Sequence, residues 1–147
     1  MIIEAIQRIN DKSYHLSIVG PAPNEKYFKE LKDLIDKSDL QNQVSLIGPV
    51  DRESVKDYYS TSNLMILPSI SEGLARVIFE SQVAMCPVLV TDAPGMSDIV
   101  IDGQTGYVFK SNNLDSLSLK IEYIKNNYDE ASLVAKNAKG FILSNYS

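Results

Sequence analysis

The chain has 147 residues, of which 44% are hydrophobic and 22% are charged, as is usual for one globular domain. This composition excludes an intrinsically disordered chain, and the single cysteine, Cys86, excludes a disulfide framework and a zinc site of several thiolates. The net charge of -5, with no run of Lys or Arg, argues against a nucleic-acid partner. No apolar stretch approaches the ~20 residues of a membrane span, so we expect a cytoplasmic protein.

The hydrophobic pattern alternates between the period of helices and that of strands along the whole chain. Short apolar runs end in turns that contain Gly or Pro, and longer segments carry apolar residues three and four positions apart. In chain order, the pattern predicts a helix over 2–9, a strand over 14–19, a helix over 24–37, a strand over 44–47, a helix over 51–59, a strand over 64–67, a helix over 75–85, a strand over 88–90, a short helix over 96–100, a strand over 107–109 and two helices over 114–126 and 129–143.

This alternation of strands and helices is typical of βαβ units. The runs at 64–67 and 88–90 are apolar on both faces, as expected for parallel strands covered by helices. We therefore predict an α/β fold with a doubly wound, Rossmann-like sheet of about five parallel strands. Ligands bind such sheets beyond the carboxyl ends of the strands, so the candidate turns are 20–22, 48–52, 68–75 and 91–97.

The turn after the strand at 64–67 has residues suited to an anion flanked by hydroxyl groups. A helix that starts near Leu74 has free N–H groups and a dipole that favours phosphate, and Gly73 allows close approach. Glu72 precedes this helix, and Glu80 lies about 9 Å further along its axis at ~1.5 Å per residue. Two carboxylates would repel phosphate, but they can accept hydrogen bonds from the sugar and ribose hydroxyls of a nucleotide-sugar. Alternatively, Glu72 is an ordinary first-turn acid and Glu80 a solvated helix residue.

A second anion site is predicted after the strand at 88–90, where Gly95 frees the backbone and Met96 begins a short helix. The alternative there is an ordinary Pro-Gly turn. Because both turns follow neighbouring strands, the two sites could converge on one ligand. We interpret the lone His15 as structural and Cys86 as a small buried hydrophobe.

Several motifs occur in a fixed order. They are 68–73 with Glu80, then 87–91, 94–95, 98–100 and 102–108, preceded by the strand-turn segments 16–21 and 44–50. In this order they resemble the C-terminal domain of family 4 retaining glycosyltransferases, which have the GT-B fold. The resemblance covers nearly the whole chain.

The resemblance implies a role for each matching residue. Glu72 would be the catalytic residue that contacts the donor sugar, and Glu80 would hold the ribose hydroxyls. The remaining donor-binding positions would be the backbone of Gly73, Leu74, Ala75, Arg76 and Val77, then Gly95 and Met96 near the sugar, and Gly20, Gly48, Val50 and Arg52 around the base. The family needs no divalent metal, so the resemblance implies no cofactor besides the donor.

The sequence also departs from the family. Met85 stands where a glycine usually ends the helix in a left-handed conformation. Arg76 places a cation in the first helical turn, against the helix dipole. A bound diphosphate would reverse this unfavourable interaction; alternatively, Arg76 points away into solvent. The family's Gly-Arg and Lys upstream, its last helix and its N-terminal acceptor domain have no counterpart in residues 1–147. The resemblance thus implies a single nucleotide-sugar-binding domain, truncated at both ends.

The expected function is the donor-binding half of a retaining glycosyltransferase in polysaccharide or glycolipid synthesis. Its expected partners are a nucleotide-sugar and the missing N-terminal domain, and the full-length enzyme could act at the membrane surface. We expect the isolated chain to bind donor weakly and to be inactive. One alternative is a non-catalytic binding or assembly domain that works with a separate N-terminal chain. Another is half of a GT-B-like epimerase, whose acidic and His pattern is not found here.

Overall fold

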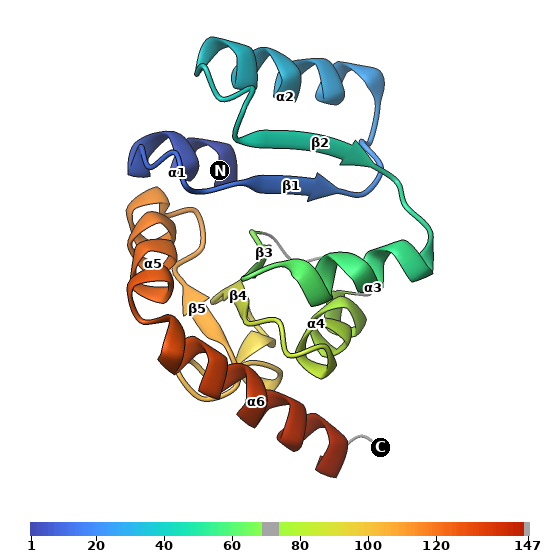
Figure 1. The fold of residues 1–147 in the computed structure, drawn as a ribbon, viewed down its shortest axis with the longest axis vertical. Helices are drawn as coiled ribbons and strands as arrows, with labels where there is room; N and C mark the ends of the chain where they lie inside the picture. The colour runs from blue at the N-terminus through green and yellow to red at the C-terminus, as the bar shows by residue number, and fades with distance from the viewer. Residues whose placement is uncertain (69–73, 146–147) are drawn as a thin grey trace. The chain divides into compact units, whose positions relative to one another are not determined.

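The computed structural model describes residues 1–68 and 74–145, in which helices and strands alternate (Figure 1). The chain divides into two compact units, Met1–Arg52 and Glu53–Ser147, which are described in turn. The elements, in chain order, are α1 (Ile2–Ile9), β1 (Leu16–Val19), α2 (Glu25–Lys37), β2 (Val44–Gly48), α3 (Arg52–Thr61), β3 (Met65–Leu67), α4 (Leu74–Val83), β4 (Val88–Thr91), the 3-10 turn η1 (Met96–Asp98), β5 (Tyr107–Phe109), α5 (Leu114–Asn126) and α6 (Tyr128–Asn145). Each element predicted from the sequence is therefore present.

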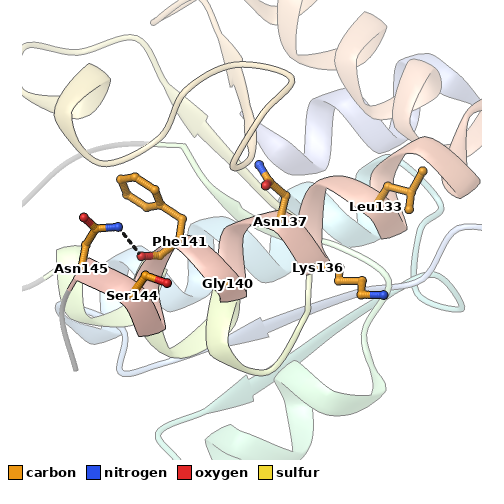
Figure 2. Close-up of a pocket in the computed structure, with 7 residues that line it drawn as sticks. All are labelled: Leu133, Lys136, Asn137, Gly140, Phe141, Ser144 and Asn145. Carbon is orange, nitrogen blue, oxygen red and sulfur yellow. Dashed lines mark hydrogen bonds between the residues drawn. The ribbon is translucent and has the colours of Figure 1, made fainter.

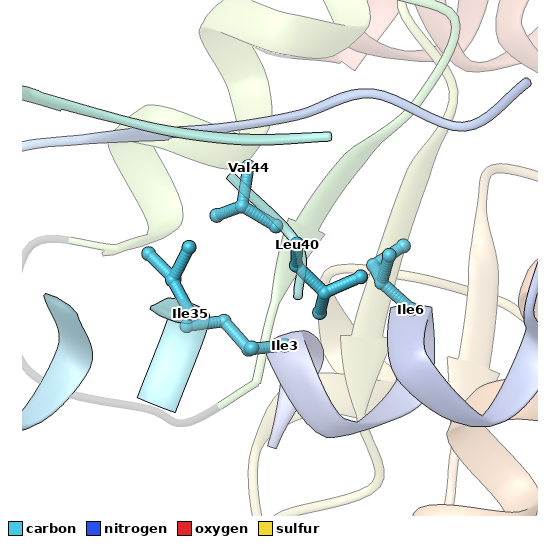
Figure 3. Close-up of a cluster of buried hydrophobic side chains, with 5 residues drawn as sticks. All are labelled: Ile3, Ile6, Ile35, Leu40 and Val44. Atoms are coloured by element: carbon cyan, nitrogen blue, oxygen red, sulfur yellow. The ribbon is translucent and has the colours of Figure 1, made fainter. Parts of the chain in front are cut away.

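The first unit is built on the parallel pair of β1 and β2. Leu16 lies opposite Val44, and an irregularity after Ile18 places Val19 opposite Gly48. The side chain of Asn24 accepts the Tyr27 N–H at 2.8 Å, which fixes the start of α2. The helices and strands share a buried apolar cluster of Ile3, Ile6, Ile35, Leu40 and Val44 (Figure 3).

The second unit is built on the parallel sheet β3-β4-β5. The four residues of the central strand, Val88–Thr91, are at most 2% exposed, which confirms the prediction of a strand buried on both faces. The same prediction for the run at 64–67 is not met, because the residues of β3 are only half-buried. The prediction of about five parallel strands is also confirmed. Hydrogen bonds join them, however, as a two-stranded and a three-stranded sheet.

The helices of the second unit cover this sheet. Ile78 of α4 is fully buried and belongs to a core cluster with Val88, Val90, Met96 and Val100. The helix α5 packs against β5, and α6 packs against α4 and α5 (Figure 1). None of the helices in the described residues is long and apolar enough to cross a membrane.

The helix α4 ends in a left-handed residue, as the sequence comparison with the family suggests. Met85 has a φ of 59°, its N–H donates to the Gln82 carbonyl at 3.0 Å, and the Cys86 N–H donates to the Ser81 carbonyl at 3.0 Å. This pair of hydrogen bonds is the Schellman motif, which normally has glycine at its left-handed position. Met85 therefore occupies a glycine-type conformation.

Candidate functional site

The start of α4 lies where the sequence predicts it. The helix begins at Leu74, and Ala75 is its second residue. Glu72 and Gly73, the predicted catalytic residue and its neighbour, lie outside the described residues. The first N–H groups of an α-helix have no acceptor within the helix, so this end can bind an anion.

Two predicted turns belong to one edge of the three-stranded sheet. The strands β3 and β4 are parallel and pair directly, with Leu67 opposite Val90. Their carboxyl ends are therefore neighbours, which agrees with the expectation that the turns after them adjoin each other.

The side chains of Arg76 and Glu80 form an ion pair on α4. The Nε of Arg76 lies 2.9 Å from the Oε1 of Glu80. The Arg76 side chain is 60% exposed and that of Glu80 31% exposed, whereas Ile78 on the opposite helix face is fully buried. Glu80 thus lies on the accessible face, as a hydroxyl-binding residue must. This pair is not among the predictions from the sequence, although a spacing of four residues is the usual signal for one.

A buried phenol lies in the electrostatic surroundings of Glu80. Tyr59 of α3 is 8% exposed, and burial, followed by the charge of the Glu80 carboxylate, raises the pKa of Tyr59. Tyr59 therefore packs in the interior of its unit. The Glu80 side chain, 31% exposed, is half-buried and pairs with the exposed guanidinium of Arg76.

The turn after β4 is tighter than the sequence predicts. The predicted helix over 96–100 is a single 3-10 turn, Met96–Asp98, in which the Ile99 N–H donates to the Met96 carbonyl three residues earlier at 2.9 Å. The helix does not continue, because the Ile101 N–H donates to Thr105 Oγ1 at 2.9 Å. Met96 is 3% exposed, and its N–H donates to the Ala93 carbonyl at 3.1 Å. A Cβ on Gly95, which has a φ of 89°, would meet no atom within 4 Å. Gly95 is thus the open position of this turn.

A hollow of about 600 Å³ adjoins this turn. Its polar lining includes Asp92, Ser97, Asp102, Lys110 and Lys120. Lys120 Nζ lies 3.1 Å from Asp102 Oδ2, and Asp92 accepts the N–H and the hydroxyl of Ser111, each at 2.8 Å. The bonds from Ser111 hold the pKa of Asp92 below its ordinary value. The hollow thus offers charges of both signs, which suit a polar, hydroxyl-rich ligand.

The predicted base-binding turns lie in the first unit. The Gly20 N–H donates to the Gly48 carbonyl at 2.9 Å, so the turns after β1 and β2 are side by side. Both glycines have positive φ values, 131° and 79°. Val50 is half-buried, and Arg52 is exposed at the start of α3. The structure thus brings Gly20 together with Gly48, and Arg76 together with Glu80, each within its own unit.

A further hollow, of about 570 Å³, runs along α6 (Figure 2). Its lining residues are Leu133, Lys136, Asn137, Gly140, Phe141, Ser144 and Asn145. The Asn145 amide donates to the Phe141 carbonyl at 2.8 Å, so that side chain is used within the helix. This lining includes no residue that the sequence predicts for donor binding.

The remaining reactive side chains have structural surroundings. Cys86 is 1% exposed, and burial raises the pKa of its thiol, which confirms that it is a buried hydrophobe. His15 is exposed, and its Nε2 lies 3.2 Å from Ser45 Oγ. Within residues 1–68 and 74–145, no group of three His, Cys, Asp or Glu could hold a metal ion.

Comparison with known proteins identifies the family. The sequence profile of the family described as "Glycosyl transferases group 1" matches residues 1–141. An uncharacterized glycosyltransferase of Methanocaldococcus jannaschii is 28% identical over 136 residues, which are 92% of this chain and 38% of that protein. The capsular polysaccharide biosynthesis glycosyltransferase CapM of Staphylococcus aureus is 24% identical over 99% of this chain and 38% of its own length.

A solved structure has the same fold. The crystal structure of Anabaena HepE in complex with UDP-glucose has a TM-score of 0.89 and 22% sequence identity, over 99% of this chain and 40% of that one. The chain thus spans about two fifths of the length of these relatives. Its parallel α/β, Rossmann-like architecture is that of one half of a GT-B glycosyltransferase, and the chain belongs to the group 1 glycosyl transferases.

Proposed function

We propose that this chain is the donor-binding half of a retaining glycosyltransferase, which transfers a sugar from a nucleoside-diphosphate sugar to an acceptor. The observation that carries the proposal is the position of α4. This helix starts at Leu74, follows β3 beside the end of β4, and presents Glu80 on its accessible face. The family membership and the UDP-glucose bound by the Anabaena protein support a donor of this class.

The proposed roles divide along the donor molecule. Glu72 would act at the reacting sugar, and Glu80 would accept hydrogen bonds from the ribose hydroxyls. The backbone N–H groups from Gly73 to Val77 would bind sugar hydroxyls and the distal phosphate. Near the same sugar, Gly95 offers open space, and the buried Met96 would act by holding the turn in place. Gly20, Gly48, Val50 and Arg52 would surround the base.

The acceptor would be bound by a further domain of the whole protein. The curated relatives are longer than this chain, which matches 38% of the length of each of the two. The capsular polysaccharide relative favours a role in polysaccharide synthesis, and glycolipid synthesis at the membrane surface is the other pathway. Residues 1–147 alone would bind donor weakly and transfer no sugar, and no divalent metal would be needed.

Calorimetric titration of residues 1–147 with UDP, GDP and ADP tests the ribose assignment. We expect E80A to lower the affinity for the tightest-binding of these nucleotides about tenfold, because a hydrogen bond to a charged carboxylate is lost. The matched control is E122A, which removes an exposed carboxylate from α5 and should leave affinity unchanged. For the corresponding 2′-deoxynucleotide, which lacks one ribose hydroxyl, E80A should cause a smaller loss of affinity. Equal affinities for wild type and E80A would show that Glu80 does not bind ribose.

Further measurements test the rest of the proposal. If none of the three nucleotides binds, the chain is not a donor-binding domain. Donor affinity should be the same with and without EDTA, and a loss would contradict the metal-independent mechanism. Sugar transfer by residues 1–147 alone would contradict the predicted inactivity. Donor binding with no transfer by the full-length protein would favour the assembly domain, and inverted products would contradict retention.

A further inference from the structure

The ion pair of Arg76 and Glu80 uses a small part of each side chain. A guanidinium has five N–H donors, and Arg76 uses its Nε–H on Glu80 Oε1 at 2.9 Å. Within residues 1–68 and 74–145, this is the one hydrogen bond or ion pair of the Arg76 side chain. Among the described residues, no further hydrogen bond or ion pair engages the two Nη groups or the Oε2 of Glu80, which leaves these atoms for a ligand.

Stability alone gives little reason for this pair. The Arg76 side chain is 60% exposed, and exposed pairs four residues apart contribute little to folding. Arg76 is also the third residue of α4, where the helix dipole disfavours a cation. A bound anion would reverse this unfavourable interaction.

We propose that Arg76 recognises the diphosphate of the donor: its Nη groups bind phosphate oxygens while its Nε–H stays on Glu80. A guanidinium binds two phosphate oxygens through parallel N–H groups, a geometry that lysine cannot match. The second oxygen of Glu80 remains for a ribose hydroxyl. Since ribose and diphosphate are covalently joined, one helix face can hold both. The inference rests on the proposed function and names a side chain that selects nucleoside diphosphates over nucleosides.

Each member of the pair would also orient the other. The hydrogen bond to Glu80 fixes the guanidinium plane before the ligand arrives, so fewer side-chain conformations are lost on binding. Arg76 in turn holds the carboxylate on the accessible face. The two residues are distinguishable, because Arg76 would contact phosphate and Glu80 would contact ribose.

Titration of residues 1–147 with the tightest of UDP, GDP and ADP, and with its nucleoside, tests the inference. We expect R76Q to weaken the nucleoside diphosphate about tenfold and the nucleoside by no more than about twofold. R76K should give an intermediate loss, because its point charge remains while the two-pronged geometry is lost. The matched control K136Q removes an exposed cation from α6 and should change neither affinity.

The outcomes separate the inference from the proposed function. Equal losses for diphosphate and nucleoside in R76Q would show that Arg76 acts through Glu80 alone, and the inference would be wrong. If R76Q left both affinities unchanged, the inference would also be wrong. The proposed function would still stand, as long as the wild type binds the nucleoside diphosphate. If the wild type binds none of the three nucleotides, both are wrong. Equal thermal unfolding of R76Q and K136Q would exclude a folding defect.

Discussion

Gly106, just before β5, lies where no side chain fits. A Cβ at this position would lie 2.5 Å from Val88 Cγ2 and 2.7 Å from Val100 Cγ1. Both neighbours belong to the buried core, so they have little room to move. We expect G106A to lower the free energy of unfolding by about 1–3 kcal/mol, measured by urea denaturation.

The matched substitution for this prediction is G140A in α6. A Cβ on Gly140 would meet no atom within 4 Å, and a glycine inside a helix makes the helix less stable than an alanine does. G140A should therefore raise the free energy of unfolding by about 0.5–1 kcal/mol. If both variants changed stability in the same direction, the packing argument for Gly106 would fail.

Asp92 makes stability depend on pH. The two hydrogen bonds from Ser111 favour its carboxylate form and lower its pKa in the folded chain. Their contribution is complete above the unfolded pKa of about 3.9 and is lost as the pH falls through the lower folded value. We expect the stability difference between wild type and D92N to shrink as the pH falls from about 5 to about 3, measured as urea midpoints.

The comparison for Asp92 is D57N, which removes an exposed carboxylate from α3. Its stability difference from the wild type should vary less with pH than that of D92N. A difference for D92N that stays constant down to pH 3 would show that the bonds from Ser111 do not favour the charged form.

At the scale of elements, the end of α4 is strained by its side chain. Met85 has a φ of 59°, a conformation that is unfavourable for a residue with a side chain. Its side chain is 50% exposed, so its burial offsets little of this cost. A left-handed conformation costs a non-glycine residue about 1–2 kcal/mol. We expect M85G to raise the free energy of unfolding by about 1 kcal/mol, measured by chemical denaturation.

A second left-handed residue provides the comparison for M85G. Asn10 ends α1 with a φ of 54°, but asparagine tolerates this conformation better than methionine. N10G should therefore stabilise the chain less than M85G. Equal gains would mean that the methionine side chain is not the source of strain at position 85.

At the scale of the whole molecule, local sequence patterns predict the elements and their order. Asn24 and Asn113 accept N–H groups at the starts of α2 and α5, and both helices begin within a residue of their predicted positions. The strand predicted over 14–19 begins instead at Leu16, because the Tyr14 N–H donates to the Asp11 carbonyl in a turn. The pairing of strands as two and three depends on tertiary contacts, which local periodicity does not contain.

The candidate site is predictable to the same extent. The positions of Leu74 and Glu80 on α4 follow from the helix pattern, and their donor-binding roles stay predictions, as does the role of Glu72. The hydrogen bonds from Ser111 to Asp92 and the position of Tyr59 near Glu80 could not be predicted. They join residues 19 and 21 positions apart, and the sequence holds no local signal for such contacts.

The burial of Cys86 has a practical consequence for spectroscopy. It is the one thiol of the chain, it is 1% exposed, and its raised pKa disfavours the reactive thiolate. A cysteine placed at an exposed position of α6, such as that of Leu133 at 68% exposure, would react far faster. A fluorophore or spin label can thus be attached at one chosen site with the native cysteine still in place.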